Sequence, residues 1–216
     1  MKLLLTSAGI TNDSIKKSFF DLVGKKPEDI SLAFIPTASN VETGDKDWLV
    51  EDLIRLKNLN LKSINTVDIS AVPESIWRPQ LEESDVLFFE GGDTFHLMEW
   101  INKSGLSLML PELLKTKVYV GVSAGSMVAS CDLLLNLSQK LYEEDLDRTE
   151  EMAGLNLVDF YILPHLNSMF FTKVVEERIK SFGIKEKIYV LDDMSAVVVD
   201  DGKTEIVSEG KYLELN

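Results

Sequence analysis

Short, uninterrupted apolar runs recur along this chain and alternate with amphipathic stretches. The runs that we expect to form strands are 2–6, 31–35, 61–68, 86–89, 118–122, 160–163 and 187–191. Most of them are apolar throughout rather than at every second position, as in strands that are buried on both faces of a sheet. The alternation of such strands with helices favours an α/β fold, with a parallel sheet covered by helices on both faces.

The helical segments carry apolar residues at spacings of three and four. The first is expected to begin at an N-cap, Asn12 or Asp13, and to end at Gly24. The same pattern indicates a second helix around 49–56 and a late one over 171–182.

From Met194 onward the pattern changes to two or three short strands. They are separated by Asp201-Gly202 and Glu209-Gly210, which are turns typical of antiparallel hairpins. The sequence therefore predicts a C-terminal antiparallel hairpin attached to the parallel sheet.

Length and charge limit the classes of protein to consider. A chain of 216 residues is expected to form one domain, 1–216, with a sizeable core. Its formal charge of −14 opposes binding to phosphate backbones, so we expect no nucleic acid partner. No apolar run approaches the roughly 18–20 residues that cross a bilayer, so we expect no membrane partner. The apolar start is too short for a signal peptide and is interpreted as the first strand.

Cysteine and histidine are scarce. The single cysteine, Cys131, has no partner for an intramolecular disulfide, so the cytoplasm is the expected location. One cysteine and two histidines argue against a metal site rich in these ligands, whereas a carboxylate site for magnesium or calcium stays open. The number of subunits also stays open, with a homodimer among the choices.

The strongest motif is Gly121-Val122-Ser123-Ala124-Gly125, which lies between the apolar stretch 117–120 and a helix-compatible stretch, 124–130. This is G-x-S-x-G in the strand–turn–helix context that its mechanism requires. Such a turn strains the backbone of the serine and admits only glycine two positions to either side. Ser123 is therefore the candidate nucleophile, with the N–H of Ala124 directed at a developing oxyanion. The alternative is a tightly packed turn in which Ser123 is only an N-cap.

A second motif, Glu90-Gly91-Gly92-Asp93-Thr94, follows the strand at 86–89 and precedes a helix expected at 95–101. Adjacent glycines let a backbone approach a ligand closely and aim N–H groups at it. Gly92 is therefore expected to be the second oxyanion donor, beside Ala124. The alternative is a plain turn with Asp93 or Thr94 as the helix N-cap.

A serine nucleophile needs a base, and histidine suits both proton steps. His165 follows the strand at 160–163 and so lies at a carboxyl end, where sites of open α/β sheets assemble. His96 lies near the start of a helix, a place that suits substrate contact or packing better. We expect His165 to be the base and keep His96 as the alternative.

The acid that orients the base is expected from Asp192-Asp193, which closes the strand at 187–191. Because side chains alternate along a strand, one of the two should point into the site and the other to solvent. Asp193 is the preferred residue. Asp192, Asp132 and an acid within 143–147 remain alternatives.

The polar stretch 138–152 is expected to be a solvated loop or helix face, or else a flap over the site.

In this order, the motifs resemble those of peptidase E and its relatives in peptidase family S51, which include aspartyl dipeptidases and cyanophycinases. The resemblance covers nearly the whole chain, through Ala33–Ala38, Gly91–Leu97, Gly121–Ser126, Pro164-His165 and the Asp192-Asp193 region. It implies a sheet and helices of the class I glutamine amidotransferase type. It also implies hydrolysis by a Ser–His–acid triad without a cofactor, and Asp-X dipeptide substrates in the best-known members.

Two departures from the family pattern affect the expected site. The triad acid of some members lies in the loop after the serine helix, where 130–140 offers only Asp132, so the strand-end acid is kept. Aspartyl-specific members carry a glycine-containing loop and then an arginine after the histidine. Here 166–171 has no glycine and Val175 stands at the arginine position, with Lys173 as a nearby cation. We therefore expect a protein that is not a strict aspartyl dipeptidase.

Together these features predict a flavodoxin-like α/β protein that acts as a serine peptidase on short peptides. The catalytic residues would be Ser123, His165 and Asp193, with Gly92 and Ala124 holding the oxyanion and no metal or cofactor. The alternatives are an amidase or esterase on a non-peptide substrate, since the same triad serves any acyl transfer, and a non-catalytic module that binds a small molecule.

Overall fold

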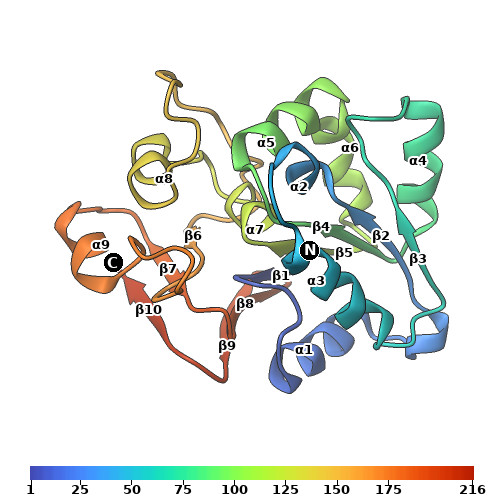
Figure 1. Cartoon of the computed structure of the whole chain (residues 1–216). Coiled ribbons are helices and arrows are strands. Elements are labelled where there is room, and N and C mark those ends of the chain that lie inside the picture. The colour runs from blue at the N-terminus through green and yellow to red at the C-terminus, as the bar shows by residue number, and fades with distance from the viewer.

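The computed structural model describes residues 1–216 and contains two β-sheets (Figure 1). The larger sheet has seven strands in the order β3-β2-β4-β5-β1-β8-β9, and the smaller has three in the order β10-β7-β6. The strands of the larger sheet are β1 (Lys2–Thr6), β2 (Ser31–Ile35), β3 (Ser63–Thr66), β4 (Val86–Phe89), β5 (Val118–Val122), β8 (Ser195–Asp200) and β9 (Lys203–Ser208). Those of the smaller sheet are β6 (Tyr161–Leu163), β7 (Ile188–Leu191) and β10 (Tyr212–Leu215).

Strands β1 to β5 pair in parallel, and β8 and β9 continue the sheet in antiparallel. The mostly parallel α/β sheet and the C-terminal antiparallel strands predicted from the sequence are therefore confirmed. The hairpin β8–β9 turns at Asp201-Gly202, as expected.

Helices cover both faces of the larger sheet because successive residues of its strands face opposite sides. Leu3 and Leu5 pack on one side, with helices α4 (Glu74–Glu83), α5 (Thr94–Lys103), α6 (Leu106–Leu113) and α7 (Ala124–Met127). Leu4 packs on the other, with α1 (Asp13–Val23) and α3 (Asp47–Lys57) (Figure 1). The short helix α2 (Thr37–Val41) packs beside α5, and a 3-10 turn, η1 (Pro27–Asp29), precedes β2.

Two of the predicted strands, 160–163 and 187–191, belong to the smaller sheet rather than to the larger, mostly parallel sheet. Strands β6 and β7 of the smaller sheet pair in parallel with each other, and β10 adds antiparallel to β7. They cannot extend the larger sheet at β1, because β5 and β8 already occupy both edges of that strand. Helices α8 (Leu135–Leu141) and α9 (Glu176–Ser181) cover the smaller sheet through a separate apolar cluster, at the left of Figure 1.

Helix boundaries match the sequence where a cap defines them. Asn12 caps α1 by accepting the N–H of Ile15, and Gly24 ends that helix in the left-handed conformation. The late helix expected over 171–182 is shorter than predicted, because Val175 is extended and α9 begins only after it. The helix expected over 124–130 is likewise only α7, Ala124–Met127. No helix is long and apolar enough to span a membrane.

The packing of α7 against β4 depends on Gly125. A Cβ atom at this position would overlap the backbone carbonyl of Phe89. We expect Gly125→Ala to lower the free energy of unfolding by about 3 kcal/mol, because overpacking against backbone cannot be relieved by a rotamer change. The measurement is equilibrium urea denaturation.

Gly44→Ala is the matched control. Gly44 has a positive φ, of 88°, unlike Gly125, and no atom lies within 4 Å of its Cβ position. Gly44→Ala should lower the free energy of unfolding by only about 1–2 kcal/mol, the cost of a side chain in the left-handed conformation. Equal losses in the two variants would contradict the packing argument.

Candidate active site

Ser123 lies in a tight turn between β5 and α7, with φ 47° and ψ −109°. Two glycines make this turn sterically possible: a Cβ on Gly121 would lie 2.5 Å from the carbonyl oxygen of Gly125, and one on Gly125 would overlap Phe89. The N–H of Ser123 donates to the carbonyl of Thr6 at the end of β1 (3.0 Å). The Ser123 side chain makes no N-cap hydrogen bond, so its hydroxyl is available for another partner.

That partner is His165, which follows β6. Its Nε2 lies 2.9 Å from Ser123 Oγ, and its side chain is only 13% exposed. The ring of Phe171 stacks on the imidazole, with centroids 4.3 Å apart and planes 15° apart. His165 itself has a positive φ of 67°, an uncommon conformation for a residue with a side chain. The structure thus brings the two residues predicted as nucleophile and base into hydrogen-bond contact.

Asp193 completes the line of contacts, since its Oδ1 lies 2.7 Å from His165 Nδ1. The same oxygen accepts the hydroxyl of Ser7, which follows β1 (2.9 Å), and Ser7 Oγ accepts the N–H of His165 (2.8 Å). Burial by itself would raise the pKa of Asp193. The hydrogen bond and charge of His165, together with the Ser7 hydroxyl, lower it by more, so the pKa of Asp193 lies below its ordinary value. Asp193 is therefore ionised at neutral pH beside the imidazole.

Asp192 is partly buried and held by hydrogen bonds, whereas the second acid of the pair was expected to point to solvent. Its carboxylate accepts the N–H groups of Met194 (3.0 Å) and Lys211, and the hydroxyl of Ser195 (2.6 Å). These bonds tie the end of β7 to the chain before β10. Asp192 therefore has a structural role, and the difference arises because a turn rather than a regular strand follows Leu191.

The other acids considered from the sequence lie in contacts of their own. Asp132 accepts the hydroxyl of Tyr161 (2.9 Å) and the N–H of Leu134 (3.1 Å). Within 143–147, Glu143 pairs with Lys173 and Asp145 with Arg148. None of these carboxylates has a hydrogen bond to His165.

The backbone N–H groups of Gly92 and Ala124 donate to no acceptor within the protein. Gly92 has φ 127°, and a Cβ there would overlap the carbonyl of Ala38, so only glycine fits this turn. The neighbouring Gly91 lies close to the nucleophile, since a Cβ on it would be 3.3 Å from Ser123 Cβ. Both predicted oxyanion donors therefore lie near the turn at Ser123 and have N–H groups without an acceptor in the protein.

Asp93 has the N-cap role expected for it, and His96, the alternative base, does not contact Ser123. Asp93 is the N-cap of α5 and accepts the N–H of His96 (2.7 Å). The His96 ring lies near Trp100, with centroids 6.4 Å apart, and has no hydrogen bond to Ser123.

The stretch 138–152 forms the end of α8 and a loop held against the site. The Tyr142 hydroxyl donates to the carbonyl of Pro164 (3.0 Å), and its ring meets Phe171 edge-on. Glu144 accepts the N–H of Thr94 at the start of α5 (2.6 Å), and burial, followed by the charge of Asp93, raises its pKa to about 8. Arg148 binds Glu99 on α5 (2.6 Å). The loop is thus anchored next to the site rather than simply solvated.

Several residues at the site were not predicted from the sequence. Ser7 and Phe171 contact the histidine and its acid, and the ring of Trp48 reaches within 3.9 Å of the Cβ position of Gly91. Glu90 is completely buried directly before the double glycine. Ser7 and Glu90 are polar residues that directly follow parallel strands, and this position is the one sequence signal by which they could have been found.

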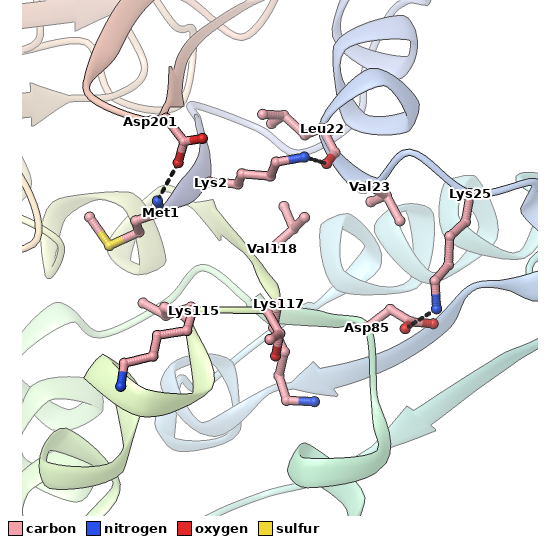
Figure 2. A pocket seen from close by; sticks show the side chains of 12 residues that line it. Met1, Lys2, Leu22, Val23, Lys25, Asp85, Lys115, Lys117, Val118 and Asp201 are labelled. Carbon is pink, nitrogen blue, oxygen red and sulfur yellow. Dashed lines mark hydrogen bonds and ion pairs between the residues drawn. The ribbon is translucent and has the colours of Figure 1, made fainter.

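A cavity of about 190 Å³ lies at the opposite edge of the larger sheet, where β1 and β5 begin (Figure 2). Its lysines are bound to the protein: Lys2 donates to the carbonyl of Leu22 (2.7 Å), and Lys25 pairs with Asp85 (2.6 Å). Because the cavity lies where β1 and β5 begin and Ser123 lies where β5 ends, the cavity is separate from the Ser123 site.

No group of three or more His, Cys, Asp or Glu side chains is placed to hold a metal ion.

Comparison with known proteins gives matches along most of the chain. Residues 3–207 match the model of Peptidase family S51. An uncharacterized peptidase of Pasteurella multocida is 27% identical over 196 residues, which span 88% of this chain and 89% of the relative. An uncharacterized peptidase of Listeria innocua is 30% identical over 180 residues, 79% of this chain and 81% of the relative.

Solved structures share the fold. A candidate peptidase E from Listeria monocytogenes superposes with a TM-score of 0.78 at 24% identity, covering 97% of this chain and 98% of that one. A peptidase from an acI-B1 actinobacterium gives a TM-score of 0.67 at 18% identity, over 99% of this chain and 96% of that one.

The contacts of Asp193 and Asp192 predict opposite effects for two matched substitutions. Asp193→Asn should slow fluorophosphonate labelling of Ser123 by about 10²-fold or more, because an amide favours the wrong imidazole tautomer. Its unfolding midpoint should change little. Asp192→Asn should leave labelling within about threefold and lower the free energy of unfolding by about 1–2 kcal/mol, since one donor loses its acceptor. Labelling rates and urea denaturation measure both effects, and similar behaviour of the two variants would contradict the assignment.

Proposed function

The chain belongs to peptidase family S51, and on this premise we propose that it is a serine hydrolase that cleaves short peptides. The observation that carries the proposal is the unbroken line of contacts from Ser123 Oγ through both ring nitrogens of His165 to Asp193 Oδ1. The strained backbone of Ser123 supports it further, because such strain persists at functional sites when the surrounding structure enforces it.

The proposed reaction follows from the positions of these atoms. Ser123 Oγ attacks the carbonyl carbon of the scissile bond while His165 Nε2 takes the hydroxyl proton. The negative charge that develops on the carbonyl oxygen is held by the N–H groups of Gly92 and Ala124. His165 then gives its proton to the leaving amine, the C–N bond breaks and an acyl-enzyme remains. Water, activated by the same imidazole, hydrolyses the ester and restores Ser123.

Asp193 and Ser7 fix the base in one tautomer. With Asp193 accepting from Nδ1–H, the unprotonated Nε2 faces the serine, and the imidazolium formed during the reaction lies against an ionised carboxylate. The Ser7 hydroxyl holds this carboxylate and also accepts the backbone N–H of His165. One residue at the end of β1 thereby positions both partners.

The proposed substrate preference follows from the cations near the site. Lys173 pairs with Glu143, and Arg178 donates to the carbonyl of Lys140. Lys103 pairs with Glu99. Val175, where aspartyl-specific members carry an arginine, is the N-cap residue of α9. A buried substrate carboxylate without a paired cation costs several kcal/mol, so we propose that the enzyme is not a strict aspartyl dipeptidase.

Apolar side chains line the approach to the nucleophile instead. The ring of Trp48 lies against Gly91, beside Ser123, and Phe171 covers His165. Met169 and Phe170, in the loop after His165, are 79% and 83% exposed. A substrate with an apolar or small residue at the scissile bond fits these surroundings better than one with aspartate.

The nucleophile is tested by Ser123→Ala. The variant should lose at least about 10³-fold in kcat on the best dipeptide of a library while keeping the parental melting temperature, because triad residues act as a unit. His165→Ala should abolish fluorophosphonate labelling of Ser123. The matched control, His96→Ala, should leave labelling within about tenfold, since general base assistance supplies roughly 10²–10⁴. Near-parental turnover in Ser123→Ala would exclude the mechanism.

The substrate preference is tested by kcat/KM for Asp-Leu against Ala-Leu and Leu-Leu dipeptide amides. Comparable rates, or faster cleavage of the apolar substrates, are expected because Lys173, Arg178 and Lys103 are bound to other groups of the protein. A preference for aspartate of about 100-fold or more, roughly 2.7 kcal/mol, would mean that a cation such as Arg148 leaves its protein partners to bind substrate.

A further inference from the structure

Glu90 is a fully buried acid at the site that the proposed mechanism does not use. It follows β4, and its backbone N–H continues the sheet by donating to Ile35 (3.1 Å). Its side chain turns back, so that Oε1 accepts the N–H of the next residue, Gly91 (2.9 Å). Its other oxygen, Oε2, is buried and has no hydrogen-bond partner in the protein. An ionised carboxylate in such a place would be strongly unfavourable.

A second buried acid, Asp52 on α3, lies close enough to act on Glu90. Its side chain is 7% exposed, and its Oδ1 binds Arg55 Nη1 (2.6 Å). The Arg55 guanidinium also reaches Glu51 (3.2 Å) at the surface. The charged groups that face Glu90 are thus Asp52 and Arg55, both from α3, and Asp52 in turn faces Arg55 and Glu51.

The two acids compete for one proton, and their partners decide which of them holds it. Asp52 has the positive guanidinium of Arg55, whereas Glu90 has only a backbone N–H. Burial, and then the negative charge of Asp52, raise the pKa of Glu90 well above its ordinary value. Burial also raises the pKa of Asp52, but Arg55 opposes the shift. At neutral pH the proton therefore resides on Glu90.

We propose that Glu90 is a positioning residue. As a neutral carboxyl group next to Asp52, it holds the Gly91–Gly92 turn so that the Gly92 N–H stays free for the substrate oxyanion. The inference rests on the proposed hydrolytic function. Its physical basis is that the carbonyl oxygen of a neutral carboxyl group accepts the Gly91 N–H. The turn is thereby fixed without a negative charge on Glu90 beside the developing oxyanion.

The geometry of the turn explains why the hydrogen bond from the Gly91 N–H to Glu90 is needed. Gly92 has a positive φ and packs against the carbonyl of Ala38, and Asp93 N–H donates to that same carbonyl (3.1 Å). The Gly91 peptide between β4 and this contact has no other acceptor for its N–H than Glu90 Oε1. Glycines resist rotation only weakly, so the side-chain bond decides the orientation of the peptide.

The sign of the pH dependence follows from the raised pKa of Glu90. In the unfolded chain glutamate ionises near pH 4.3, whereas in the folded protein it stays protonated to higher pH. The folded state therefore binds one proton more in this window, and its stability falls as the pH rises until the folded pKa is passed. Glu144, whose pKa is raised to about 8, contributes in the same direction and must be separated from Glu90.

The decisive variant is Glu90→Gln, which keeps an oxygen for the Gly91 N–H and presents an amide donor where the proton would be. We expect kcat at pH 7 within about threefold of the parent. The unfolding midpoint of the variant should rise relative to the parent as the pH increases above about 4.3, because the parent alone loses a proton on unfolding. Glu90→Ala removes the acceptor and should lower kcat about tenfold or more with a smaller change in KM, a partial loss of oxyanion stabilisation.

Infrared absorption supplies a readout that does not depend on activity. The band of neutral buried carboxyl groups should lose one component in Glu90→Gln at pH 7, with Glu144→Gln as the matched control that removes the other buried acid. Asp52→Asn should move the loss of the Glu90 component to lower pH, since the nearby negative charge is gone while Arg55 remains.

Three results would overturn the proposal: an unchanged neutral-carboxyl band in Glu90→Gln, a loss of kcat in Glu90→Gln as large as in Glu90→Ala, or parental kcat in a folded Glu90→Ala. If Glu90→Ala does not fold, the glutamine variant and the infrared band still decide. A parent protein that neither cleaves peptides nor reacts with fluorophosphonate would refute the hydrolytic function instead, while the infrared and unfolding results would still report on Glu90.

Discussion

The backbone conformation of Ser123 is the constraint on which the rest of the structure depends. A serine at φ 47° and ψ −109° is unfavourable by itself, and the surrounding contacts compensate for it. The Tyr119 hydroxyl binds the carbonyl of Gly125 (2.6 Å), and the Ser126 hydroxyl binds that of Thr6 (2.7 Å), both fully buried. Together with the absence of Cβ atoms at the two glycines, these bonds seat α7 directly on β4 and β5. The serine oxygen is consequently presented at the carboxyl edge of the sheet, where the ends of β1 and β4 also lie.

The smaller sheet has to be joined to this edge accurately, because His165 and Asp193 follow its strands. Ser7 makes the junction: its hydroxyl accepts the N–H of His165 and donates to Asp193. Thr11 then donates to the carbonyl of Asp193 (2.8 Å), and the Asn12 amide to that of Met194 (2.9 Å). Most of the alignment between the two sheets at this point thus comes from one short segment after β1.

The parts of the site that follow from local rules could be predicted from the sequence. The elbow at Ser123 and the strand-end positions of His165 and Asp193 need only the order of strands and the rule that such ends gather. The division into two sheets could not be predicted, since it depends on β8 occupying the edge of β1, a pairing between chain ends. The contact of Asp52 with Glu90 is equally non-local. In the sequence an acid on an amphipathic helix such as α3 resembles any solvated charge, and only the approach of Gly9 and Glu90 in the fold buries it.

The protonation of the buried acids bears on how a chain with a charge of −14 can stabilise an oxyanion. In the proposed mechanism, negative charge near the imidazole is useful because it favours the imidazolium, and Asp193 would supply that charge. Negative charge near the Gly92 turn would oppose the developing oxyanion, most strongly where water is excluded. Glu90 and Glu144 both lie beside this turn, and burial raises the pKa of each, which favours their neutral forms. The site therefore combines the ionised Asp193 behind the base with two buried acids, Glu90 and Glu144, whose neutral forms are favoured near the proposed oxyanion donors. In this arrangement Glu90 and Glu144 oppose the unused N–H groups of Gly92 and Ala124 less than two ionised carboxylates would.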